Sequence, residues 1–136
     1  MRQGLVPGCK VEPEACPQFT KLREYWKKHG YPSIDTDLVE AFQNISKDIQ
    51  ANHGREMPRF SALLGGRKLF KYRQKNSGAR EGARGGWRII AILVPDTAVL
   101  YPIIVYPKKE WPDADDDTVK AGIKEIIAIL TSMFSV

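Results

Sequence analysis

The spacing of hydrophobic residues changes twice along this chain, and that change constrains the fold more than any other feature. From residue 17 to about residue 50, apolar side chains recur every three or four positions, which is typical of helices that bury one face. Between residues 70 and 106 the spacing is two, which predicts strands. After residue 118 the helical spacing returns. Helices and strands in separate runs predict an α+β fold.

Two helices are predicted in the first half. Pro17 suits the first turn of a helix that Gly30 and Pro32 bring to an end. The second helix is predicted to begin with Asp35 as its N-cap and to end at residues 52–54, Asn-His-Gly. Its apolar stripe consists of Leu38, Phe42, Ile45 and Ile49. A short connection between these helices predicts an antiparallel helical hairpin.

The strands are expected at residues 70–75, 87–94 and 98–106, separated by a glycine-rich basic loop and a tight turn. They predict a small antiparallel sheet of three to four strands with the helices on one face. Pro102 lies inside the last strand and implies a bulge or an edge. The C-terminal helix follows an acidic run that we interpret as its N-terminus. That run contains Asp113, Asp115, Asp116 and Asp117.

The length of 136 residues allows one ordinary domain. We interpret residues 1–16 as an irregular lead-in with a short strand around Leu5 and Val6, and residues 17–136 as a single domain. No apolar run approaches the roughly 18 residues of a membrane span, and the first residues lack the apolar core of a signal peptide. The expected location is therefore the cytoplasm. Cys9 and Cys16 are expected to be free thiols, with a disulfide as the alternative.

The charge is strongly segregated. The whole chain carries a formal net charge of +5, but residues 67–109 alone hold ten basic and two acidic side chains, while residues 110–136 are acidic. A concentrated basic segment beside an acidic tail indicates a surface that binds a polyanion, although a solvated loop is the simpler alternative.

Few residues suggest catalysis by their spacing. His29 and His53 each stand at a predicted helix end, where histidine usually caps the helix. The chain shows no Ser–His–Asp arrangement and no phosphate-binding loop motif, and it contains no pattern that calls for a metal or a cofactor. What remains is a set of cations on neighbouring strands. Lys71, Arg73 and Lys75 are predicted on one face of the sheet, with Arg88 on the adjacent strand.

Three runs resemble the RelE/ParE superfamily of bacterial toxins. They are Lys-Tyr-Arg-Gln-Lys-Asn-Ser-Gly at residues 71–78, Gly-Gly-Trp-Arg-Ile-Ile at residues 85–90 and Tyr-Pro-Lys-Lys at residues 106–109. The Gly-x-Arg strand motif of that family is matched by Gly86, Trp87 and Arg88. The resemblance implies a RelE-like fold and the toxin of a toxin–antitoxin system. It further implies an endoribonuclease that cuts mRNA by 2′-hydroxyl attack without a metal, in association with the ribosome.

The charge pattern and the resemblance together assign candidate roles to the basic residues and to Tyr106. The expected catalytic residues are Arg88, Lys71, Arg73 and Lys108. The expected RNA-binding residues are Lys75, Arg80, Arg84, Lys109 and Tyr106. The general base is left open. Glu81 or Glu110 could serve as the base, although each is more easily explained as a surface ion-pair partner.

The expected partners are mRNA, the ribosome and an acidic antitoxin protein, with no membrane. The antitoxin is expected to bring acidic residues to the Lys71–Arg88 face and an apolar segment to the sheet edge or to the terminal helix, which ends in Met133 and Phe134. Two alternatives remain at this point. One is a toxin of the same scaffold that binds a protein such as gyrase, and the other is an RNA-binding module without catalytic activity.

Overall fold

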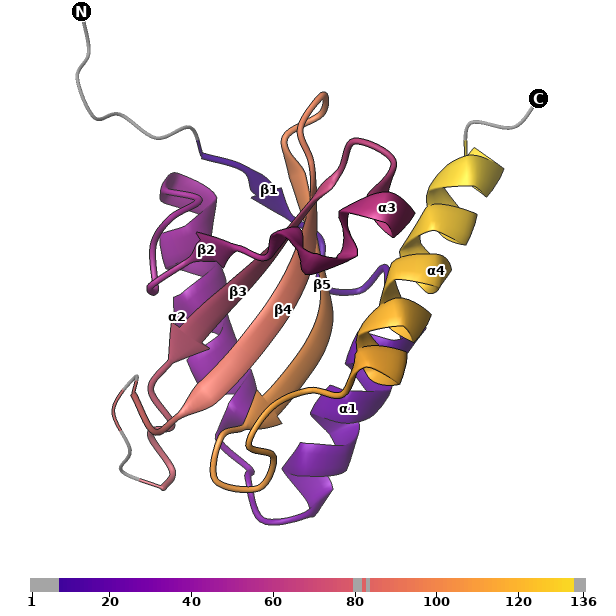
Figure 1. Cartoon of the computed structure of the whole chain (residues 1–136). Coiled ribbons are helices and arrows are strands. Elements are labelled where there is room, and N and C mark those ends of the chain that lie inside the picture. The colour runs from indigo at the N-terminus through magenta and orange to yellow at the C-terminus, as the bar shows by residue number, and fades with distance from the viewer. Residues whose placement is uncertain (1–7, 80–81, 83, 134–136) are drawn as a thin grey trace, which may run out of the picture.

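A computed structural model describes residues 8–79, 82 and 84–133 (Figure 1). The fold is α+β, as the change in hydrophobic spacing predicted. The helices are α1 (Pro17–Lys28), α2 (Ile34–Lys47), α3 (Ser61–Leu64) and α4 (Asp116–Met133), with a 3-10 turn at Pro58–Phe60. The strands are β1 (Lys10–Val11), β2 (Arg55–Glu56), β3 (Lys68–Gln74), β4 (Trp87–Val94) and β5 (Val99–Pro107).

Within the described residues the strands form one five-stranded mixed sheet in the order β1-β5-β4-β3-β2. The three long strands form the antiparallel meander that the sequence predicted. Two strands of two residues each extend it, with β1 parallel to β5 and β2 antiparallel to β3. The prediction of three to four strands missed one of these short additions. The strand predicted around Leu5 and Val6 lies outside the described residues, and the observed β1 begins at Lys10.

The helices cover both faces of the sheet, so the prediction that they lie on one face was wrong. Helix α2 lies behind the sheet in Figure 1, on the face that carries Tyr72 and Trp87, whereas α3 and α4 lie in front. Helix α4 packs chiefly against β5. One part of the front face, over the lower ends of β3 and β4 in this view, has no helix over it (Figure 1).

Helix α1 protects the outer edge of β5, where β1 pairs with only two residues. The indole Nε1 of Trp26 donates to the Val105 carbonyl at 2.9 Å, and the Gln18 amide donates to the Ile103 carbonyl at 3.0 Å. These side chains satisfy carbonyl groups that an exposed edge would offer to another strand. The bulge expected from Pro102 is present, because the β4–β5 register shifts between Ile90 and Ala91, the residue paired with Pro102.

Helix α2 differs from its prediction at both ends. Ser33, not Asp35, occupies the N-cap position, and Asp35 lies in the first turn. The helix ends at Lys47, so residues 52–54 belong to a separate turn. The sequence pattern extended the helix too far because Ile49, although it packs against the core, follows the last helical turn. Cys9 and Cys16 are free thiols, as expected, and no described helix is long and apolar enough to cross a membrane.

Candidate phosphate-binding site

Among the described residues, six cationic side chains and one histidine line a pocket on the uncovered part of the sheet. We call it the basic pocket, and its lining residues are His53, Arg55, Lys71, Arg73, Arg84, Arg88 and Lys108. Its volume is about 190 Å³. Clefts for drug-sized ligands measure roughly 300–1,000 Å³, so this pocket fits a small anionic group such as a phosphate better than a whole nucleotide.

The strand register brings the basic residues together. Arg73 on β3 pairs with Arg88 on β4, and Arg88 pairs in turn with Tyr106 on β5. Lys71 lies two residues before Arg73 and therefore shares its face, whereas Tyr72 between them points to α2. This alternation of aromatic and basic residues confirms the predicted facing of β3. The short strand β2 adds Arg55 beside Lys71.

Arg88 forms the buried floor of the basic pocket, with only 4% of its surface exposed. Its guanidinium donates to the Arg84 carbonyl at 2.6 Å and to the Trp87 carbonyl at 3.3 Å. Burial lowers the pKa of Arg88 from its usual value, and the neighbouring Arg73 and Arg55 lower it further, while Tyr106 acts in the opposite direction. A bound phosphate would offset both the burial cost and the like-charge repulsion, because arginine donors match phosphate oxygens.

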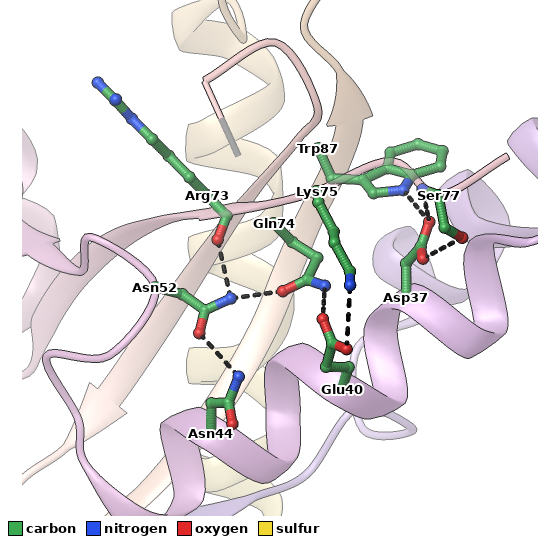
Figure 2. Close-up of polar contacts among 9 residues, drawn as sticks. All are labelled: Asp37, Glu40, Asn44, Asn52, Arg73, Gln74, Lys75, Ser77 and Trp87. Carbon is green, nitrogen blue, oxygen red and sulfur yellow. Dashed lines mark hydrogen bonds and ion pairs between the residues drawn. The ribbon is translucent and has the colours of Figure 1, made fainter. Parts of the chain in front are cut away.

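Asp37 on α2 fixes the start of β4 from the opposite face (Figure 2). Its carboxylate is 2% exposed and accepts hydrogen bonds from the Trp87 indole at 2.9 Å and from the Ser77 hydroxyl at 2.6 Å. Gly86 precedes Trp87, and a Cβ at Gly86 would lie 2.3 Å from the Gln74 carbonyl oxygen. Glycine at this position therefore lets β4 approach β3 closely, just before Arg88.

Lys71 and Tyr106 meet on Asp113, which lies in the loop before α4. Asp113 Oδ1 accepts from Lys71 Nζ at 2.9 Å and from the Tyr106 hydroxyl at 3.2 Å. Partial burial opposes ionisation of Asp113, but the hydrogen bond and charge of Lys71, together with hydrogen bonds from the Ala114 amide and Tyr106, outweigh it and lower the pKa of the carboxyl. Burial and the Asp113 charge raise the pKa of Tyr106, so its hydroxyl stays protonated and donates. This cluster holds the Lys71 ammonium at the pocket.

The structure brings together five of the nine residues predicted for the site. Arg88, Lys71, Arg73, Lys108 and Arg84 all line the basic pocket.

The other four predicted residues lie elsewhere or are not described. Lys75 follows the end of β3 and turns to the α2 side, where its Nζ lies 3.6 Å from Glu40 Oε1 (Figure 2), so its predicted place beside Lys71 and Arg73 was wrong. Lys109 lines a different cavity. Tyr106 is fully buried, so no base can stack on its ring in this conformation. Arg80 lies outside the described residues.

Three residues of this region were not expected at the site from the sequence. His53 was interpreted as a helix cap, Asp113 as part of a helix N-terminus, and Arg55 was given no role. Asp116 and Asp117 do lie in the first turn of α4, but Asp113 precedes the helix and faces Lys71. Of the two carboxylates considered as a base, Glu110 accepts from the Tyr31 hydroxyl at 2.7 Å and lines the other cavity. Glu81 lies outside the described residues.

The donors of the basic pocket are suited to an anion. In the part of the chain that the structure describes, no group of three or more His, Cys, Asp or Glu side chains is arranged to hold a metal ion. Guanidinium and ammonium groups instead converge from β2, β3, β4 and the residue after β5. Comparisons of the chain with protein-family models, curated proteins and solved structures found no significant match. The chemistry of the pocket therefore carries the functional argument.

Proposed function

We propose that the protein is an endoribonuclease toxin of the RelE-like type, which cuts mRNA by 2′-hydroxyl attack without a metal cofactor. The observation that carries this proposal is the position of Arg88. It is a buried arginine in a central strand, at the floor of a pocket whose other described lining residues are five Arg or Lys side chains and one histidine. A cation held by a strand keeps its geometry better than one on a loop, as a catalytic group requires.

The proposed chemistry uses the cations of the basic pocket to stabilise negative charge. When the 2′-oxygen attacks phosphorus, charge builds on the phosphoryl oxygens, and fixed donors aimed at that charge lower the barrier. Arg88 and Arg73 contribute guanidinium groups side by side across β3 and β4. Lys71 and Lys108 contribute ammonium groups from two sides of the pocket. The expected products are a 2′,3′-cyclic phosphate and a 5′-hydroxyl.

The arrangement of elements supports the RelE-like part of the proposal. The long helices α1 and α2 and the four-residue α3 precede the antiparallel meander, and the long α4 follows it. The order of the long helices and the meander is the one that the sequence resemblance implies. Gly86, Trp87 and Arg88, the residues that match the family's strand motif, have distinct structural tasks. Gly86 allows the close approach of two strands, Trp87 anchors to Asp37 from one face, and Arg88 reaches the pocket on the other.

The proposed partners are mRNA on the ribosome and an acidic antitoxin that covers the basic pocket. A second surface offers an apolar anchor for such an antitoxin. It is a groove of about 470 Å³ between the β4–β5 hairpin and the end of α4, with Val94, Tyr101 and Leu130 among its lining residues. Met133 at its margin is 65% exposed, whereas Phe134 lies outside the described residues. Charge at the pocket would speed association, and apolar contact in the groove would slow dissociation.

The test of the proposed function is cleavage of mRNA, with and without ribosomes, by wild-type protein and by Arg88→Ala. We expect the substitution to lower kcat by about 10²–10³-fold, the usual effect of removing one donor to a developing oxyanion. Arg67→Ala is the matched control, because Arg67 precedes β3 at the end opposite Arg73 and lies outside the basic pocket. Circular dichroism checks that both variants are folded. Lys108→Ala provides a second pocket variant, and because Lys108 is exposed this change should not disturb the core.

The products and the metal dependence decide between the proposal and its alternatives. Cleavage should persist in EDTA and leave 2′,3′-cyclic phosphate ends. A wild-type protein that binds RNA tightly but cuts none, with or without ribosomes, would indicate an RNA-binding module. Full cleavage by a folded Arg88→Ala variant would contradict the assignment of the basic pocket as the active site.

A further inference from the structure

His53 differs from every other residue that lines the basic pocket. The six remaining described lining residues are arginines and lysines, which are cationic at neutral pH. Imidazole is the side chain whose ordinary protonation change falls between about pH 5 and pH 8, so it can accept a proton under physiological conditions. His53 is exposed at the pocket, where it can reach a bound RNA. Of the two carboxylates considered from the sequence, Glu110 lines another cavity and Glu81 lies outside the described residues.

The main chain next to His53 is anchored to β3 by Asn52. The Arg73 amide donates to the Asn52 carbonyl at 2.8 Å, and the Asn52 side-chain amide donates to the Arg73 carbonyl at 2.9 Å (Figure 2). The same amide also reaches Gln74 Oε1 at 2.5 Å. Asn52 thus holds both backbone groups of Arg73, a residue whose side chain lines the pocket. The turn that carries His53 is therefore joined directly to the catalytic strand.

The turn itself is held in an unfavourable conformation. Asn52 and His53 both have a φ of 57°, in the left-handed region. This region is uncommon for residues other than glycine, although Asn and His adopt it more readily than most, and surrounding contacts hold it here. Gly54 follows, and a Cβ there would lie 2.4 Å from the Tyr72 ring. The chain is thus packed against β3 immediately after His53, which keeps the imidazole beside Arg73.

We propose that His53 is the general base of the RNA cleavage, an inference that rests on the proposed function. The imidazole nitrogen takes the proton of the 2′-hydroxyl while the 2′-oxygen forms a bond to phosphorus. The bond between phosphorus and the 5′-oxygen breaks, and the leaving oxygen takes a proton from the Lys71 ammonium. His53 then releases its proton to solvent and Lys71 regains one, so the enzyme returns to its starting state.

The charged groups around His53 suit the pocket to an RNA phosphate, which must lie beside the base for this reaction. Among the residues that the structure describes, the charged groups that line the pocket with His53 are all cations. They are Arg55 from β2, Lys71 and Arg73 from β3, Arg84 from the β3–β4 loop, Arg88 from β4 and Lys108 after β5. The RNA phosphate supplies the negative charge that balances these cations, and its binding brings the adjacent 2′-hydroxyl to the imidazole.

The test compares wild-type protein with His53→Gln on an RNA that the wild-type protein cleaves. We expect kcat to fall by about 10²–10⁴-fold, the usual contribution of a general base. RNA binding should stay within about threefold of wild type, because glutamine keeps polar contacts and the six cations remain. The pH profile is the decisive readout: the rise in kcat/KM between about pH 5 and pH 8 should disappear in His53→Gln.

His29→Gln is the matched control, since the only other histidine lies on a different cavity and bonds the Tyr25 carbonyl. Its rate and pH profile should equal those of wild type. If wild-type protein cuts no RNA, the proposed function fails, and the inference fails with it. If wild-type protein cuts RNA and His53→Gln retains both the rate and the pH profile, only the inference on His53 is overturned. A His53→Gln protein in which KM rises while kcat is unchanged would also overturn the inference, because it would show that His53 only binds RNA.

Discussion

Replacement of Asp37 should destabilise this protein, although the residue lies on the sheet face opposite the basic pocket. The buried carboxylate joins α2 to Ser77 after β3 and to Trp87 at the start of β4 (Figure 2). Asp37→Ala removes the acceptor for the indole N–H of Trp87 as well as for the amide and hydroxyl of Ser77. The consequences differ for these donors because Trp87 is fully buried, whereas Ser77 is exposed and can bond water instead.

The magnitude follows from this difference. A hydrogen bond to a charged acceptor contributes about 1.5–3 kcal/mol, and a buried donor left without a partner costs about 1–3 kcal/mol. Removing a buried charge recovers part of the loss, since the carboxylate no longer has to be desolvated. We therefore expect Asp37→Ala to lower the free energy of unfolding by about 3 kcal/mol. Asp37→Asn keeps one acceptor oxygen and should cost about 1 kcal/mol.

The assay is urea unfolding at pH 7, followed by circular dichroism and by tryptophan fluorescence. Asp35→Ala is the matched control, because Asp35 lies on the same helix and its loss changes the net charge equally. Its ion pair with Lys27 is exposed, so we expect a cost below about 1 kcal/mol. An Asp37→Ala protein no less stable than Asp35→Ala would refute the reasoning, as would an Asp37→Asn protein that loses as much as Asp37→Ala.

Two further predictions concern the sheet and its cations. Gly86→Ala should lower the free energy of unfolding by several kcal/mol, because its Cβ would lie 2.3 Å from the Gln74 carbonyl oxygen. Urea unfolding measures this loss, and Gly82→Ala is the control, since a Cβ there meets nothing within 4 Å. Lys108→Gln should weaken RNA binding and reduce the slope of log affinity against log salt by about one, whereas Lys75→Gln should change neither. Filter-binding titrations measure both quantities. If the two variants lose affinity equally, the assignment of Lys75 to the α2 side is contradicted.

The sequence predicted the local features because local rules determine them. The period of two in β3 determined which side chains face α2 and which face the opposite side, and the structure confirms this for Lys71 and Tyr72. Pro17 and Pro102 marked a helix start and a bulge for steric reasons that need no tertiary information. Lys75 was misplaced because the strand ends at Gln74, so the alternation that was extrapolated to it no longer applies.

The composition of the candidate site depended on contacts between distant parts of the chain. Asp113 reaches Lys71 across 42 residues, and no spacing rule connects a loop acid with a strand lysine. His53 enters the pocket because α2 ends at Lys47 and Asn52 then binds the backbone of Arg73, 21 residues further on. By itself the sequence determined the class of the fold, the sequence of helices and strands, and the basic face of β3. Only the tertiary structure decided that this face stays uncovered between α4 and β2, because helix packing and strand register depend on how the whole core is filled.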